Sequence, residues 1–327
     1  MLRGYLIRKI IISFITLWVI VTLNFMIFRV LVGGNPADLI INPKMPKAVR
    51  DALKSQWGLD KPLFPDQYLL YLYNLFTWNY GNQFDETASP VAPEMAWRLR
   101  NTLILLGCST AGTIALGIPI GMFAASRRGR KADVAVMGIG LFTYGVPTFF
   151  IQMIWVTIFC MQLGILPRAG LTSLPPPQNP LDLAIDVLKH AISPIVTLIL
   201  AGFGSWALYT RNLMIDALTE DFILTARAKG LSEKDVIYKH AFKSILPPIV
   251  TMVALAIPGI VTGAVITESI FAWEGIGRWY IQSLTGANWP VAQAVLYNYA
   301  VLMVIANLIA DIAYGFLDPR IRIGVRR

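Results

Sequence analysis

Hydrophobic residues along this chain gather into six long runs, and these runs give the first structural prediction. They cover residues 10–31, 102–125, 134–162, 191–210, 246–271 and 291–317. Each run is close to or above the roughly 20 residues that a helix needs to cross the hydrocarbon core of a bilayer. The pattern predicts an all-α integral membrane protein with six transmembrane helices. The first run is interpreted as an uncleaved signal anchor.

Basic residues between the runs indicate how the helices are oriented. With a cytoplasmic N-terminus, the inside segments are 1–9, 126–133, 211–245 and 318–327. Together they hold 17 of the 28 Lys and Arg residues, whereas the loops near 163–190 and 272–290 hold three. Cytoplasmic loops are rich in Lys and Arg, so we expect both termini of this multi-pass chain in the cytoplasm.

Composition agrees with a membrane protein. The 327 residues are 56% hydrophobic and 14% charged, whereas a soluble domain is about 25% charged. The net charge of +9 would suggest a nucleic-acid partner in a soluble protein. Here the basic residues lie in short loops between apolar runs, so we expect a lipid bilayer as partner and no nucleic acid.

Segment 33–98 is too long for a tight loop and is rich in Trp, Tyr and Phe. It has helix-like stretches at 46–57 and 66–76, and we expect a small ordered extracytoplasmic insertion. An aromatic layer resting at the bilayer interface would have the same composition, and the two interpretations are compatible. The Pro-rich stretch 165–181 predicts an extended external loop.

The segment 213–245 carries the most specific local pattern. Gly230 suits the position after a helix end that needs a positive φ. Ser232 and Asp235 then form an S-x-x-D capping box that starts another helix. The pattern predicts a helix, a sharp turn and a second helix on the cytoplasmic side.

Small side chains beside Gly230 would let another backbone approach this turn closely. The residues concerned are Thr225, Ala226 and Ala228, flanked by Arg227 and Lys229. We expect the turn to enter a groove on a partner protein, with Ala226 facing that groove. The alternative interpretation is an amphipathic loop packed on the membrane face.

Motifs for chemistry within the chain are absent from the sequence. It contains no Gly-x-x-x-x-Gly-Lys-[Ser/Thr] P-loop, no His-Glu-x-x-His and no Gly-x-Ser-x-Gly. We therefore expect no catalytic residues and no enzyme activity in this chain. Cys108 and Cys160 lie in separate apolar runs, and His190 and His240 lie in different segments, which predicts neither a disulfide nor a metal site.

Three ionisable residues fall within the apolar runs. Arg29 and Glu268 lie near predicted outer ends, where we expect their side chains to reach the interface. Asp311 lies about two turns from the predicted inner end of its run. An ionised Asp at the bilayer centre costs about 2.5–3.5 kcal/mol, so we expect a structural role for Asp311 at a helix end or between subunits.

The 213–245 pattern resembles the cytoplasmic Glu-Ala-Ala loop of ATP-binding-cassette importer permeases. With Gly230 aligned, the Glu-Ala-Ala places are taken by Leu224, Thr225 and Ala226. The later Ile, Leu and Pro places are taken by His240, Phe242 and Lys243. The form Thr-Ala-Arg-Ala-Lys-Gly, with His-Ala ten residues later, is similar to the peptide/nickel/opine uptake branch.

Further segments along nearly the whole chain resemble the same branch in the same order. They are 57–63, 116–121, 163–167, 268–271, 275–278, 307–311 and 318–322. The long segment 33–98 resembles the first permease of the dipeptide/oligopeptide pair.

The resemblance implies a type I ABC importer permease in a prokaryotic inner membrane, for peptides or similarly sized solutes. The implied partners are a second homologous permease, two ATP-binding-cassette ATPases and an extracytoplasmic solute-binding protein. ATP and magnesium would be held by the ATPases, with no cofactor in this chain. The implied ATPase-coupling residues are Thr225, Ala226, Arg227, Ala228, Lys229, Gly230, Leu231 and Ser232.

Two questions stay open in the sequence. The solute could be a dipeptide, a longer peptide, glutathione, a nickel complex or an oligosaccharide. The alternative function is a self-contained secondary transporter or channel, which would need an ion-coupling site and often two related halves. The docking turn is present, whereas internal repeats and a dense acidic relay are not, which favours the importer.

The loop charges generate a topology prediction. A reporter that is active only outside the cytoplasm should be active when fused after Asn82 and silent when fused after Gly129, because the second site lies in the basic loop. Reporter activity in whole cells measures this directly, and the reverse pattern would contradict the orientation.

Overall fold

The computed structural model describes residues 2–31, 55, 61–83, 89–261 and 264–317. Their regular structure is helical, apart from one isolated antiparallel bridge between Asn82 and Pro90. The long helices are α1 (Leu2–Met26), α5 (Val91–Ser126), α8 (Pro180–Leu218), α11 (Phe242–Val261) and α14 (Trp289–Leu317). The short helices are α4 (Tyr68–Phe76), α6 (Lys131–Gly145), α7 (Thr148–Trp155), α9 (Asp221–Ala228), α10 (Glu233–Asp235), α12 (Val265–Ile270) and α13 (Ile276–Thr285). Four π-helical segments are η1 (Ile27–Leu31), η2 (Leu63–Gln67), η3 (Val156–Gln162) and η4 (Val236–Ala241).

Among the described residues, five helical segments are long and apolar enough to cross a membrane. They are Ile7–Val30, Val91–Ser126, Pro180–Leu218, Glu233–Ile260 and Trp289–Ile312. A sixth candidate is the pair α6 and α7–η3, which passes the same test only when its two halves are taken together. The predicted all-α membrane architecture is therefore confirmed among the described residues.

The third predicted span, 134–162, is not one continuous helix. Its two halves, Lys131–Gly145 and Thr148–Gln162, are bent by 98° at the intervening residues. The cause is Pro147, whose ring disfavours the helical conformation for the residue before it. Val146 is accordingly extended, with φ −83° and ψ 128°. Hydrophobicity alone could not show this break, because residues on both sides of it are apolar.

Predicted loops outside the spans agree with the described residues. The stretch 66–76 is helical, as η2 and α4, whereas the predicted helix 46–57 lies almost wholly outside the described residues. The predicted loop 165–181 contains no helix up to residue 179, and α8 begins at Pro180, within its last two residues.

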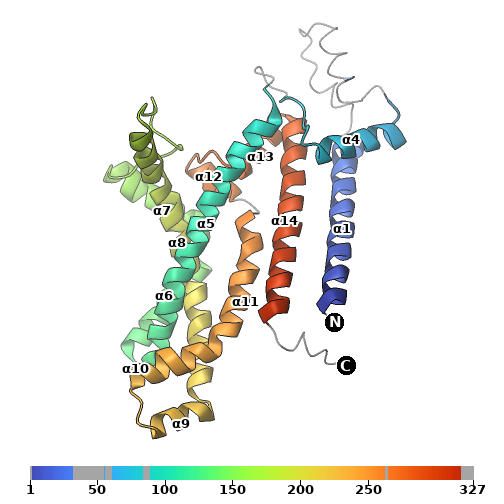
Figure 1. Ribbon diagram of the computed structural model, residues 1–327. Helices are drawn as coiled ribbons and strands as arrows, with labels where there is room; N and C mark the ends of the chain where they lie inside the picture. The colour runs from blue at the N-terminus through green and yellow to red at the C-terminus, as the bar shows by residue number, and fades with distance from the viewer. Residues whose placement is uncertain (1, 32–54, 56–60, 84–88, 262–263, 318–327) are drawn as a thin grey trace.

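The long helices run side by side and give the molecule two distinct ends (Figure 1). α1 begins and α14 ends toward the end that carries α9, which we call the α9 end. α4 lies across α1 at the opposite end, which we call the α4 end. The described parts of segments 1–9, 126–133 and 211–245, which the loop charges place on one side of the membrane, thus share the α9 end. Which end is cytoplasmic stays a prediction.

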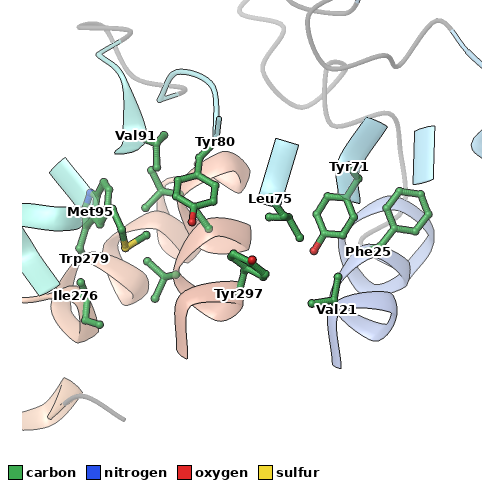
Figure 2. Close-up of a cluster of buried hydrophobic side chains, with 13 residues drawn as sticks. Val21, Phe25, Tyr71, Leu75, Tyr80, Val91, Met95, Ile276, Trp279 and Tyr297 are labelled. Carbon is green, nitrogen blue, oxygen red and sulfur yellow. The ribbon is translucent and has the colours of Figure 1, made fainter. Parts of the chain in front are cut away.

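Buried side chains form one large cluster at each end. The α4-end cluster joins α1, α4, α5, α13 and α14; its members include Val21, Phe25, Tyr71, Met95, Trp279 and Tyr297 (Figure 2). The α9-end cluster joins α5, α8, α9, η4 and α11; its members include Met122, Met214, Ile223, Val236 and Ile245. A smaller cluster contains Leu105, Ala191 and Trp273.

Close approach of α5 and α8 depends on Gly117 and Gly121, one helical turn apart on the same face of α5. A β-carbon at Gly121 would lie 2.8 Å from Thr210 Cβ and would overlap the Ala207 carbonyl oxygen. A small residue every four positions is the usual way for membrane helices to bring their backbones together.

This packing predicts a position-specific effect of adding one methyl group. Gly121→Ala should destabilise the protein by about 1–3 kcal/mol, because α5 and α8 must separate to admit it. Gly107→Ala is the matched control on the same helix, where a new β-carbon meets no atom within 4 Å. Thermal unfolding in detergent measures both variants. Equal melting temperatures for the two would show that the α5–α8 contact is not tight.

Candidate functional site

The 213–245 segment folds as a helix, a turn and a second helix, as predicted. α8 ends at Leu218, α9 runs over Asp221–Ala228, and α10 with η4 leads into α11. Gly230 lies in the turn with φ +76°, a conformation that costs a residue with a β-carbon roughly 1–2 kcal/mol. The glycine is therefore needed for its backbone, since a β-carbon there would meet no other atom within 4 Å.

Two local contacts fix the helix that follows the turn. Ser232 Oγ accepts a hydrogen bond from Asp235 N at 3.2 Å, which is the predicted N-cap. Asp235 Oδ2 in return accepts from the Ser232 hydroxyl at 2.8 Å, where a full capping box would use the Ser232 backbone N–H. The turn geometry is thus encoded within a few residues.

An ion pair closes the turn from the other side. Arg227 Nε donates to Glu233 Oε1 at 2.7 Å, and Arg227 Nη2 donates to Oε2 at 3.2 Å. This two-point contact joins the last turn of α9 to the first turn of α10, and the Glu233 carboxylate raises the pKa of Arg227. Both side chains are solvent-exposed, so the pair orders the turn more than it stabilises the fold.

Ala226 does not face outward, which corrects the expectation that its side chain meets a partner. It is 4% exposed and, with Ile223, packs in the α9-end cluster against residues of α8, η4 and α11. The reason is the helical period: Ile223 and Ala226 are three positions apart and share the inner face of α9. Ala226 therefore holds α9 in place.

The other seven residues singled out in the turn are exposed. They are Thr225, Arg227, Ala228, Lys229, Gly230, Leu231 and Ser232. Four large apolar side chains are exposed around them: Phe222, Leu224, Leu231 and Tyr238. Leu224 is 60% exposed, in a part of the chain that is not among the candidate spans. An uncovered apolar group of this kind, rimmed by charges, is typical of a protein–protein contact.

A buried ion pair that the sequence analysis missed attaches α8, which leads into this segment, to α6. Asp133 accepts from both Arg211 Nε and Arg211 Nη2, the latter at 2.8 Å. Gly129 N donates to the same carboxylate at 2.9 Å. Asp133 lies in the first turn of α6 and Arg211 two turns before the end of α8. The only sequence signal was an acidic residue two positions after the basic loop 127–131.

A second polar contact lies toward the α4 end and corrects the expectation for Glu268. Its side chain does not reach an interface, because it is fully buried. Glu268 Oε1 accepts from Thr102 Oγ1 at 2.7 Å, and Oε2 accepts from Arg278 N at 2.9 Å. Thr102 Oγ1 also accepts from Ile276 N at 2.9 Å. The carboxylate and the Thr102 hydroxyl thus accept from N–H groups at the start of α13, which have no partner within that helix.

Asp311 forms an intramolecular contact at the α9 end. Its carboxylate lies 2.9 Å from Lys9 Nζ, so that α14 and α1 are joined near the end where α1 begins. The structural role expected for Asp311 at a helix end is supported by this contact. Among the described residues, no group of three or more His, Cys, Asp or Glu side chains could hold a metal ion.

Comparison with protein-family models gives two matches that together span nearly the whole chain. Residues 117–323 match the model described as binding-protein-dependent transport system inner membrane component. Residues 1–103 match the model for the N-terminal part of such membrane components.

Curated relatives match over almost their full length. The oligopeptide transport system permease protein AppB of Bacillus subtilis is 34% identical over 98% of this chain and 99% of its own. The dipeptide permease DppB of Escherichia coli is 32% identical over 92% of this chain and 94% of its own. The glutathione permease GsiC of Escherichia coli is 32% identical over 98% of this chain and 99% of its own.

A solved structure shares the fold. The inward-facing MetNI methionine ABC transporter contains a chain that matches with a TM-score of 0.55 and 17% sequence identity. The match covers 68% of this chain and 96% of that chain.

The Asp133–Arg211 pair generates a stability prediction. Asp133→Leu should destabilise the protein by about 3–5 kcal/mol, because the Arg211 charge would be left buried without its partner. The double variant Asp133→Leu, Arg211→Met should recover most of that loss. Glu233→Leu, which breaks the exposed Arg227–Glu233 pair, is the matched control and should cost at most about 1 kcal/mol. Thermal unfolding in detergent compares the three, and equal losses in the single and double variants would contradict the role given to the pair.

Proposed function

This chain belongs to the family of binding-protein-dependent transport system inner membrane components, and we propose that it is one of two membrane-spanning subunits of an ATP-driven peptide importer. ATP, with magnesium, is hydrolysed on separate ATPase subunits, because this sequence carries no P-loop. The observation that carries the proposal is the α9–α10 turn, which is exposed at its tip and anchored by buried residues at its base.

Attachment of the turn to the long helices suits it to transmit motion. Ile223 and Ala226 of α9 pack in one cluster with Met214 of α8 and Ile245 of α11. A partner that moves α9 therefore moves α8 and α11 with it. The transporter has an inward-facing and an outward-facing state. ATP binding can drive transport in this way only if ATP binds one of these states more tightly than the other.

The exposed residues of the turn are the proposed ATPase contact. Leu224, Leu231 and Phe222 supply apolar area, and Lys229 supplies a rim charge. In this proposal the α9 end is cytoplasmic, with both termini inside, as the loop charges favour. The solute-binding protein then delivers its cargo at the α4 end, and the pathway lies between this chain and a second, homologous permease.

Short peptides are the proposed solutes. Three relatives that match nearly the full chain are named for oligopeptide, dipeptide and glutathione transport. The partner solute-binding protein should therefore be thermally stabilised by peptides of two to several residues. Stabilisation by a nickel complex or an oligosaccharide, with none by peptides, would leave the importer assignment intact and replace its solute.

The proposal predicts what single changes in the turn do to assembly and transport. Leu224→Asp should leave the subunit folded and abundant, because the side chain is already exposed, but should release the ATPases on washing. Gly230→Val should have the same effect through strain at φ +76° and a re-aimed turn. Membrane abundance, ATPase retention and peptide uptake in proteoliposomes are measured together.

Leu174→Asp is the matched control for Leu224→Asp. Leu174 is 93% exposed and lies in the loop between η3 and α8, so the same charge should leave ATPase retention and uptake unchanged. Normal retention and uptake in both turn variants would contradict the docking role. Peptide transport by the purified chain alone, without ATP, would favour a secondary transporter.

A further inference from the structure

The helix α4 is apolar on both of its faces. Tyr71 and Leu75 on one face are buried in the α4-end cluster. On the other face Leu69, Tyr73 and Phe76 are 57%, 66% and 65% exposed. These three residues have the spacing i, i+4, i+7, which places them in one stripe along the helix. A helix that is hydrophobic all round must be covered by something other than water.

The position of α4 along α1 indicates what covers it. Tyr68 of α4 shares a 2.7 Å hydrogen bond with Thr22 of α1, and the Phe25 and Tyr71 ring centroids are 5.3 Å apart. Thr22 lies eight residues before the end of the candidate span Ile7–Val30, or about 12 Å from that end at 1.5 Å per residue. α4 therefore packs beside the membrane-spanning part of α1 and not beyond it.

Contacts with α14 independently give the same position of α4 along the membrane-spanning helices. Asn298 Nδ2 donates to Tyr80 Oη at 3.1 Å, just after the end of α4. Asn298 is nine residues inside the candidate span that begins at Trp289, again about 13 Å from its end. α4 lies across α1, not along it (Figure 1). Such a helix is parallel to the membrane plane, and its contacts reach into about the third of each span that is nearest the α4 end.

The chemistry of the exposed face fits a lipid surface. Two more large side chains of residues 63–80 are exposed, Phe64 and Trp78, so that four of the five exposed large apolar side chains here are aromatic. Residues 63–80 contain one charged residue, Asp66. Tyr and Trp are enriched at membrane–water interfaces, whereas the rim of a contact with a soluble protein is polar. α1, on which α4 packs, also exposes large apolar side chains of its own, which include Leu23 and Ile27.

We propose that α4 is an interfacial helix whose stripe Leu69, Tyr73 and Phe76 inserts into the membrane leaflet at the α4 end, with phospholipid as its occupant. It anchors the outer third of α1, because the other face of the same helix packs on Val21 and Phe25. The placement holds whichever solute the importer carries.

Spin-label accessibility tests this placement in the assembled importer. The free residues Cys108 and Cys160 are first replaced by Ser, and Tyr73→Cys or Phe76→Cys is then labelled with a nitroxide. The full complex is placed in nanodiscs of phosphatidylethanolamine and phosphatidylglycerol. Collision rates are measured with oxygen, which partitions into lipid, and with a water-soluble nickel chelate. Leu23→Cys provides the lipid-facing reference and Leu174→Cys the water-facing reference.

Labels at Tyr73 and Phe76 should collide several-fold more with oxygen than with the nickel chelate, as at Leu23. The ratio should be reversed at Leu174. A nickel-accessible label at both α4 positions would overturn the proposal. Protection from both reagents in detergent-purified complex would assign the stripe to a subunit contact instead. Protection that appears only when the solute-binding protein is added would assign it to receptor docking.

Discussion

The Asp133 carboxylate accepts two hydrogen bonds from Arg211 and one from Gly129 N, with both side chains largely removed from solvent. Opening this contact would leave a charge buried without its partner, which is among the more costly local changes a fold can suffer. α6 and the end of α8 are therefore constrained to move together. Since α8 leads directly into α9, the broken span α6–α7 and the proposed ATPase contact are parts of one mechanical unit.

Different forces stabilise the two parts of that unit. α9 is held on the bundle by burial of Ile223 and Ala226, where removal of apolar area from water supplies the free energy. Lipid gives no such driving force between membrane-spanning helices, so α5 and α8 rely on close approach of their backbones at Gly117 and Gly121. The buried hydrogen bonds of Glu268 and Asp133 are directional, so they fix the positions of helices that could otherwise slide along one another.

Local signals predicted the parts of this architecture that depend on neighbouring residues. The span positions, the positive φ of Gly230 and the Ser232 cap all follow from short patterns. The break at Pro147 was equally local but was hidden by the apolar residues around it. The partners of Asp133 and Glu268 could not be predicted, because Arg211 and Thr102 lie 78 and 166 positions away. The inward orientation of Ala226 follows from helical phase relative to a cluster that only the tertiary structure defines.

Contact between the α9–α10 turn and an ATPase is the central claim, and photo-crosslinking tests it most directly. A photoreactive amino acid is placed at Leu224, or at the more exposed Leu174 as control, and membranes containing the complete importer are irradiated. The account predicts a covalent adduct between the Leu224 position and an ATPase subunit, and none from Leu174. Lipid adducts alone at Leu224, with the ATPases still bound to the complex, would contradict it.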